Sequence, residues 1–191
     1  MVITISRDMF LYQSTLVVGM VKAPVYLWTG QGWGKTTSSL GVALRAIGHG
    51  YNAVIIQFMK GRKNAIGEYK VRKKLGKLFE IYQFGRKGWV NLKNPAKEDK
   101  ALAKKALEFA KKKAKQKPFL LVLDEVNLAC DIGLINPKEV IKFLDTVPSK
   151  VHVYLTGRNA PKELIKRADY VNEIVMKKGP KKLTGEKGID Y

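Results

Sequence analysis

The chain has 191 residues, of which 46% are apolar, and it carries a formal net charge of +20. This length and composition favour one globular domain and exclude an intrinsically disordered chain, and no apolar run reaches the roughly 20 residues of a membrane span. The single cysteine, Cys130, excludes an internal disulfide framework and a multi-cysteine zinc site, so we expect a cytoplasmic protein.

Residues 1–19 stand apart from the rest of the sequence. They lack the basic start and the long apolar centre of a secretory signal, so we interpret them as either a peripheral segment or an over-extended gene start. We expect residues 20–191 to form the single domain.

Apolar, β-branched runs alternate with segments of helical periodicity along this domain. The runs predict strands at 25–29, 53–58, 79–84, 119–123, 151–156 and 171–175. The segments between them predict helices at 35–47, 66–75, 95–117, 137–145 and 161–167, three of which begin at a proline suited to a first helical turn. The alternation predicts a three-layer α/β domain with a mostly parallel sheet of about six strands, whose ligands bind beyond the carboxyl ends of the strands.

A glycine-rich loop joins the first predicted strand to the first predicted helix. It comprises Gly30, Gln31, Gly32, Trp33, Gly34, Lys35, Thr36 and Thr37. This arrangement binds a nucleotide triphosphate, because backbone N–H groups and the helix N-terminus face the phosphates, Lys35 neutralises charge and the Thr36 hydroxyl can ligate Mg²⁺. Thr29 replaces the first glycine of the usual pattern, but a mere glycine-rich turn is disfavoured by the flanking strand and helix.

Two later strands end in residues that suit a phosphate site. Asp124 and Glu125 follow the fourth strand, where carboxylates hold Mg²⁺ directly or through water; the alternative is that Asp124 caps a helix. Arg158 follows the fifth strand and suits either phosphate binding or a surface loop.

The loops after the second and third strands mix aromatic and cationic residues. Phe58 ends the second strand, and Trp89 lies in the loop after the third. These loops suit a large, partly flat substrate with polar edges, and the alternative for Trp89 is a core anchor.

Most of the excess positive charge lies in the middle of the chain, where residues 60–118 hold 20 Lys or Arg against 5 Asp or Glu. Such a surface indicates either a nucleic-acid binder or a solvated lysine-rich face. The apolar residues of the segment 101–117 recur at helical spacing, which favours the solvated face, so a nucleic-acid partner is not expected.

Taken together, these motifs resemble the phosphate-loop ATP:corrinoid adenosyltransferases of the cobalamin pathway. The resemblance extends over residues 25–191. It rests on the segments 29–37, 45–50, 57–61, 67–68, 123–125, 155–158, 168–169 and 188–191, with Pro161. It implies a RecA-type phosphate-loop fold and transfer of the 5′-deoxyadenosyl group of ATP to the Co(I) centre of a reduced corrinoid such as cobalamin, with release of triphosphate.

The resemblance also implies site residues and partners. The expected catalytic residues are Lys35, Thr36 and Glu125. The expected metal ligands are Thr36 and Glu125, and Asp124 is expected either behind these ligands or interchangeable with them. The expected nucleotide contacts are the loop residues 30–37, Arg45 and Arg158. The expected corrinoid contacts are Phe58 and Trp89. Mg²⁺ or Mn²⁺ would balance the triphosphate, the enzyme would be a homodimer, and the charge alone suggests an acidic electron-donor flavoprotein.

Three positions depart from the family pattern. Trp33 stands where a lysine is usual, Lys87 stands where the second aromatic residue of a corrin-side pair is expected, and Lys178-Gly179 replaces a Lys-His pair. Two other functions remain open at this point: a RecA-like ATPase acting on nucleic acid, and an ATP-binding regulatory module.

Overall fold

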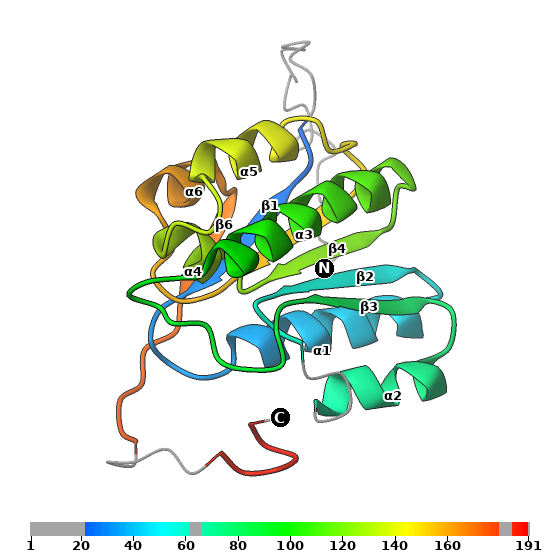
Figure 1. The fold of residues 1–191 in the computed structure, drawn as a ribbon. Helices are drawn as coiled ribbons and strands as arrows, with labels where there is room; N and C mark the ends of the chain where they lie inside the picture. The colour runs from blue at the N-terminus through cyan, green and yellow to red at the C-terminus, as the bar shows by residue number, and fades with distance from the viewer. Residues whose placement is uncertain (1–21, 62–65, 180–184, 191) are drawn as a thin grey trace, which may run out of the picture.

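The computed structural model describes residues 22–61, 66–179 and 185–190, and the expected segment 1–19 lies outside them. One sheet of six parallel strands runs through the described part, in the order β3-β2-β4-β5-β1-β6 (Figure 1). The strands are β1 Val25–Thr29, β2 Ala53–Phe58, β3 Phe79–Phe84, β4 Leu120–Asp124, β5 His152–Thr156 and β6 Tyr170–Glu173. The predicted α/β class with a parallel sheet of about six strands is therefore confirmed.

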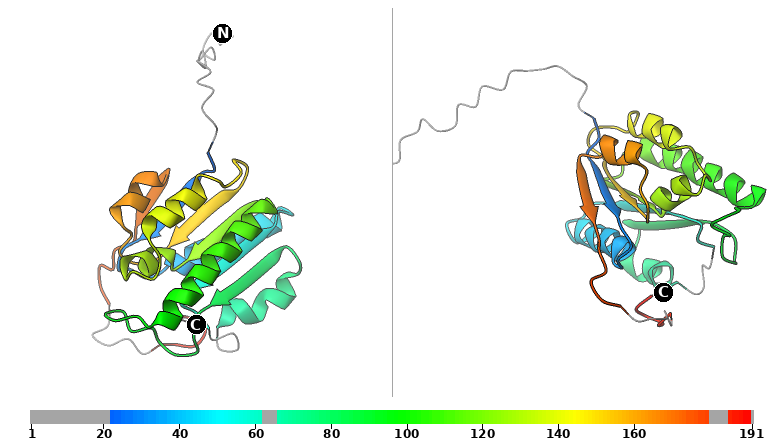
Figure 2. Two further views of the ribbon diagram at one scale, coloured as in Figure 1. Left: turned by 45° about the horizontal axis from the view of Figure 1, so that its top comes forward. Right: turned by 90° about the vertical axis from the view of Figure 1, so that its left-hand side faces the viewer.

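Helices cover both faces of the sheet. They are α1 Lys35–Gly48, α2 Gly67–Leu75, α3 Lys97–Lys115, α4 Val126–Asp131, α5 Pro137–Leu144 and α6 Lys162–Arg167. Helices α1 and α2 pack on one face, and α3 to α6 lie on the other, which gives the three predicted layers (Figures 1 and 2). None of the helices in the described ranges is long and apolar enough to cross a membrane.

Burial on two faces explains the composition of the central strands. Every residue of β2 and of β4 is buried, and both strands are almost wholly apolar, as expected for parallel strands covered on both sides. Cys130 packs in the core formed with α3 to α6, where burial raises the pKa of its thiol to about 12. Helix α3 buries its alanine and leucine stripe against the sheet and leaves most of its lysines outside, which supports the solvated-face interpretation.

The element boundaries differ from the predictions by one or two residues, and three details differ in kind. Helix α4 was not predicted, because its six residues are too few to show a helical period. Of the three prolines expected in a first turn, only Pro137 occupies one, after the cap residue Asn136. Pro161 is itself a cap residue, and Pro95 precedes the cap of α3, where the Asp99 carboxylate accepts a hydrogen bond from the Ala96 N–H.

Candidate functional site: a phosphate loop at the carboxyl edge of the sheet

The glycine loop between β1 and α1 is pinned against the backbone that follows β6. The Gly32 N–H donates to the Ile174 carbonyl at 2.7 Å, and the Ile174 N–H donates to the Thr29 carbonyl at 2.9 Å. A Cβ atom on Gly30 or Gly32 would lie 2.5 or 2.7 Å from Ile174, and Gly34 has a positive φ of 104°. The loop therefore requires glycine both for close approach and for backbone conformation.

Lys35 is the first residue of α1 and lies at the base of this loop. Its side chain is buried, and its Nζ donates to the carbonyl of Gly32. Burial, together with the neighbouring Arg158, lowers the pKa of Lys35, while Glu125 opposes the shift. The ammonium group and the free N–H groups of the helix N-terminus thus face the same concave backbone, which is the chemistry of an anion site.

Asp124 ends β4 and organises the residues around it. Its Oδ1 accepts from the hydroxyls of Thr36 at 2.8 Å and Thr156 at 2.6 Å, and its Oδ2 accepts from Gln57 at 3.0 Å and Lys60 at 2.7 Å. Burial disfavours its charge, but Lys60 and the hydrogen bonds hold the pKa of Asp124 below its ordinary value. The four bonds match the roughly four lone-pair sites of a carboxylate, so Asp124 orients Thr36 and has no site left for a metal ion.

Lys60 is the residue that the sequence did not reveal. It lies after β2 and joins Asp124 with Glu68, whose Oε1 is 3.8 Å from its Nζ. Gln57 bridges the same two carboxylates. The segment 57–61 is a block of the resemblance, but sequence alone cannot distinguish a partly buried, paired lysine from the many lysines on the surface.

Glu125 follows Asp124 in the left-handed region, with φ of 65°. Its backbone N–H donates to the Thr156 hydroxyl, which turns the carboxylate toward the loop. Its Oε2 is buried and has no hydrogen-bond partner in the described structure, and burial followed by repulsion from Asp124 raises its pKa. A buried carboxylate oxygen without a partner, on the same cavity as Thr36, fits a divalent cation with oxygen ligands.

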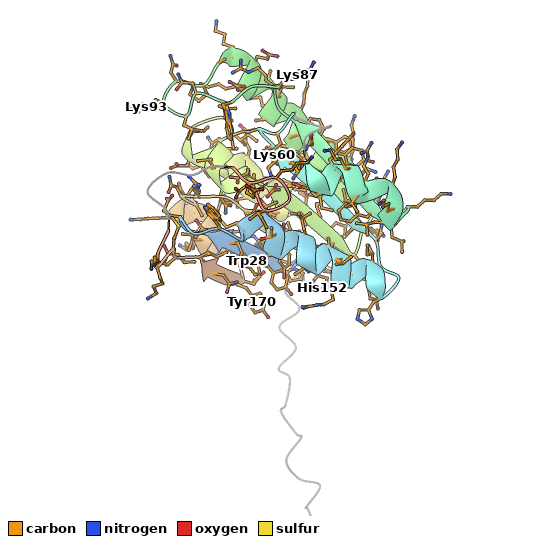
Figure 3. The ribbon with its side chains drawn as sticks, turned by 90° about the horizontal axis from the view of Figure 1, so that it is seen from below. Trp28, Lys60, Lys87, Lys93, His152 and Tyr170 are labelled. Carbon is orange, nitrogen blue, oxygen red and sulfur yellow. The ribbon has the colours of Figure 1, made fainter. Side chains whose placement is uncertain are left out.

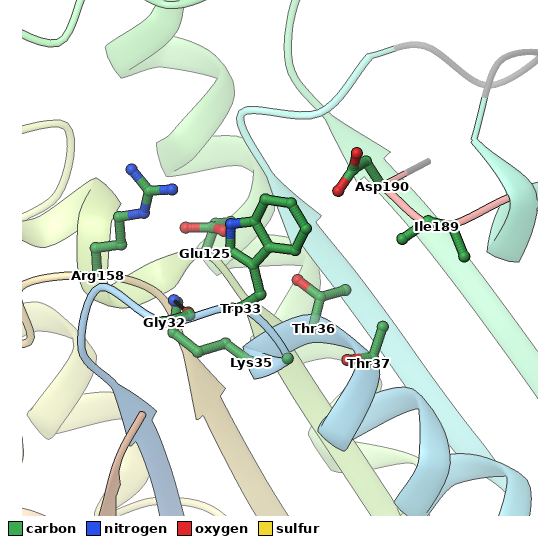
Figure 4. Close-up of a pocket in the computed structure, with 10 residues that line it drawn as sticks. Gly32, Trp33, Lys35, Thr36, Thr37, Glu125, Arg158, Ile189 and Asp190 are labelled. Atoms are coloured by element: carbon green, nitrogen blue, oxygen red, sulfur yellow. Dashed lines mark hydrogen bonds between the residues drawn. The ribbon is translucent and has the colours of Figure 1, made fainter. Parts of the chain in front are cut away.

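These side chains border one cavity of about 510 Å³ (Figure 4). It is lined by residues 32–37, Glu125, Arg158, Ile189 and Asp190. The predicted residues Lys35, Thr36, Thr37, Glu125 and Arg158 are thus brought together, with Gly32, Trp33 and Gly34. Gly30 and Gln31 shape the loop from outside the cavity, and the Gln31 side chain donates to Asn159 at 2.8 Å. Ile189 and Asp190 were not predicted as site residues, although the segment 188–191 belongs to the resemblance.

Two predicted contacts lie away from this cavity. Arg45 is in the last turn of α1, about 15 Å along the helix from Lys35 at 1.5 Å per residue, which argues against its expected nucleotide contact. Phe58 is fully buried in the core, because both faces of β2 are covered, which argues against its expected corrinoid contact. Trp89, in contrast, is 86% exposed, so it is not the core anchor considered as the alternative.

The segment 85–96 that carries Trp89 is fixed at its two ends. Arg86 donates to both carboxylate oxygens of Asp99, at 2.7 and 2.9 Å. Gly85 packs on the backbone that follows β2 so closely that a Cβ there would lie 2.4 Å from Met59, and one on Gly61 would lie 2.2 Å from Gly85. Seen from below, Lys60 lies near the middle of the view, whereas Lys87 and Lys93 lie toward its margin (Figure 3).

Comparison with known proteins identifies the chain. The model of the family described as ATP:corrinoid adenosyltransferase BtuR/CobO/CobP matches residues 22–191. A corrinoid adenosyltransferase of Sinorhizobium sp is 34% identical over 175 residues, which cover 89% of this chain and 81% of that protein. One of Pseudomonas aeruginosa is 30% identical over 166 residues, covering 85% and 81%. Among solved structures, the flagellar accessory protein FlaH of Methanocaldococcus jannaschii matches with 13% identity and a TM-score of 0.49 over 81% of this chain and 72% of that chain, too distant a likeness to carry an argument. The chain belongs to the family of ATP:corrinoid adenosyltransferases.

Proposed function

We propose that the cavity beside the phosphate loop is the place where this enzyme acts on ATP. As a corrinoid adenosyltransferase, the chain transfers the 5′-deoxyadenosyl group of ATP to the cobalt of a reduced corrinoid. The observation that supports the location is the convergence of Lys35, Thr36, Glu125 and Arg158 on one cavity beside the glycine loop.

The reaction asks the protein chiefly to stabilise a leaving group. Co(I) supplies the electron pair and attacks the 5′ carbon, the bond from that carbon to the phosphate oxygen breaks, and its electrons leave with triphosphate. Negative charge therefore grows on the triphosphate in the transition state. We assign its stabilisation to the loop N–H groups, Lys35 and Arg158, because preorganised donors in a partly enclosed site are most effective where charge develops.

Mg²⁺, or Mn²⁺ with the same preference for oxygen ligands, would be held by Thr36 and Glu125. The partnerless Oε2 of Glu125 supports this assignment, and the four hydrogen bonds that Asp124 already accepts support a role behind the ligands. No cluster of three His, Cys, Asp or Glu side chains able to hold a metal occurs within residues 22–61, 66–179 and 185–190. An ion held by few protein groups and by the phosphates of ATP needs no such cluster. When bound, the ion would neutralise phosphate charge.

The remaining assignments concern the corrinoid and the cellular setting. Trp89 lies beyond the carboxyl end of β3 with its ring largely exposed, and we assign it to the corrinoid side. A homodimer in the cytoplasm that receives its electrons from an acidic flavoprotein completes the proposal, with the lysine-rich surface as the feature that would attract such a partner.

The test is incubation with ATP, Mg²⁺ and chemically reduced cobalamin. We expect adenosylcobalamin and triphosphate to form in equal amounts, at a rate that DNA or RNA does not change. Phosphate release stimulated by nucleic acid, without adenosylcobalamin, would instead establish the ATPase alternative. Binding of ATP with neither product would establish a regulatory module.

A further inference from the structure

The two ends of the cavity differ in chemistry. The cations Lys35 and Arg158 lie on one side with Glu125, Ile189 and Asp190 lie on the other, and Trp33 lies between the two groups (Figure 4). ATP has the same division, because its triphosphate is highly charged and its nucleoside is neutral. The cationic end suits the triphosphate, which leaves the second end for another part of the molecule.

Asp190 decides which part that is. A carboxylate beside a triphosphate is unfavourable unless a cation separates them, since like charges repel over several ångströms. It does accept hydrogen bonds from hydroxyl groups, and an acidic side chain on the ribose hydroxyls is a recurring solution in nucleotide sites. The only neutral hydroxyl donors of ATP are those on its ribose.

The segment 186–190 presents this carboxylate in a defined way. The Oδ2 of Asp190 accepts from the Glu186 N–H at 2.6 Å, and the Asp190 N–H donates to the Glu186 carbonyl at 2.8 Å, which closes a turn. Within the described residues, the Oδ1 of Asp190 accepts no hydrogen bond. One oxygen thus holds the turn, and the other is available to a ligand.

Trp33 and Ile189 supply apolar surface along the same cavity, with Trp33 between the cations and the segment that carries Asp190 (Figure 4). The indole of Trp33 is 46% exposed and lines the cavity together with the side chain of Ile189. A flat aromatic ring and a branched aliphatic side chain suit the faces of a purine. The lysine usual at position 33 would offer the purine only a charge.

We propose that Trp33, Ile189 and Asp190 form the nucleoside subsite, in which Asp190 accepts hydrogen bonds from the ribose hydroxyls and Trp33 and Ile189 contact the adenine. This inference rests on the proposed function only in taking ATP as the ligand of the cavity. In this subsite, Asp190 selects a ribonucleotide. Trp33 contacts the base, whereas the lysine usual at this position would contact the phosphates.

The test compares the binding of ATP with that of 2′,3′-dideoxyATP, without corrinoid, by equilibrium titration. A hydrogen bond to a charged group predicts that the wild-type enzyme prefers ATP about tenfold or more. The variant Asp190→Asn keeps an oxygen for the Glu186 N–H but lacks a second acceptor, so its preference should fall below about twofold. Glu186→Gln, which alters only a neighbouring side chain, should retain the full preference.

Trp33 is tested by fluorescence in the same titration. ATP should quench wild-type tryptophan emission, and Trp33→Phe should lose that quenching while Trp89→Phe keeps it. An unchanged ribose preference in Asp190→Asn, or unchanged quenching in Trp33→Phe, overturns the subsite. Absence of ATP binding in the wild-type chain would overturn the proposed function itself, so the two failures are distinguishable.

Discussion

The Asp124 network and the segment 85–96 lie at the same edge of the sheet but are built in opposite ways. Asp124 is fully buried and receives hydrogen bonds from Thr36, Thr156, Gln57 and Lys60, which come from three separate parts of the chain. The segment 85–96 exposes Trp89 and Leu92 to solvent. It is held by the ion pair between Arg86 and Asp99.

The difference follows from what each region has to stabilise. Charge that develops on a leaving triphosphate requires donors that are already in place, because reorganising them during the reaction would cost free energy. A large, flat corrinoid can instead gain affinity by covering exposed apolar surface, which needs little prior order. Under the proposed assignment, we therefore expect the nucleotide half of the site to be preformed and the corrinoid half to be completed by its substrate.

The largest effect should come from removing the phosphate-facing cation. We expect Lys35→Ala to lower the rate of adenosyl transfer by about 10³-fold, at the upper end for loss of one preorganised donor. Measurement of adenosylcobalamin formation at saturating reduced cobalamin tests this. Lys104→Ala, on the exposed face of α3, is the matched control and should retain the wild-type rate; an equally active Lys35→Ala would remove the phosphate loop from the mechanism.

The next effect tests whether the buried network is what preforms the nucleotide side. Lys60→Met leaves the charge of Asp124 without its ion pair, so the free energy of unfolding should fall by about 3 kcal/mol. Urea denaturation measures this loss, and Lys60→Arg should recover most of it. Wild-type stability in Lys60→Met would show that the network does not hold this region.

Glu125 should behave as a functional residue that costs stability. The pKa of Glu125 is raised in the folded state, so folding favours its protonated form. This favourable contribution to the free energy of unfolding is fully present below the unfolded pKa of 4.5. It is lost as the pH rises through the folded pKa. Without metal, Glu125→Gln should melt about 2–4 °C higher than wild type at pH 8, with no gain at pH 4. Calorimetry at the two pH values tests this, and a lower melting temperature at pH 8 would contradict it. The same variant should lose Mg²⁺-dependent activity.

The smallest effect concerns the segment 85–96. Arg86→Ala removes an ion pair between a partly exposed arginine and a buried aspartate, and it should raise the KM for cobalamin about fivefold while leaving the KM for ATP unchanged. Lys113→Met is the control. It breaks the ion pair between Lys113 of α3 and Glu80 of β3, far from the segment 85–96, and should leave both KM values unchanged. Equal changes in both KM values in Arg86→Ala would contradict the division of the site into two independently built halves.

How much of this was predictable depends on how local each feature is. The loop from Gly30 to Thr37 and the position of Glu125 follow from contiguous motifs, whose chemistry is set by neighbours in sequence. A motif does not state where a side chain points, so Phe58 and Arg45 were expected at the site although one is buried in the core and the other lies at the far end of α1. The roles of Lys60 and Asp190 depend on contacts between distant segments, which no single segment discloses.

The close contact of Gly61 with Gly85 has a consequence for how the enzyme can change over evolution. Because the two backbones touch with no space for a Cβ atom, any larger residue at either position must push the loops apart. The spacing between the loop after β2 that holds Lys60 and the loop that carries Trp89 is therefore not freely adjustable. Acceptance of a different corrinoid should accordingly arise from exchanged side chains along the loop 86–94, with both glycines retained.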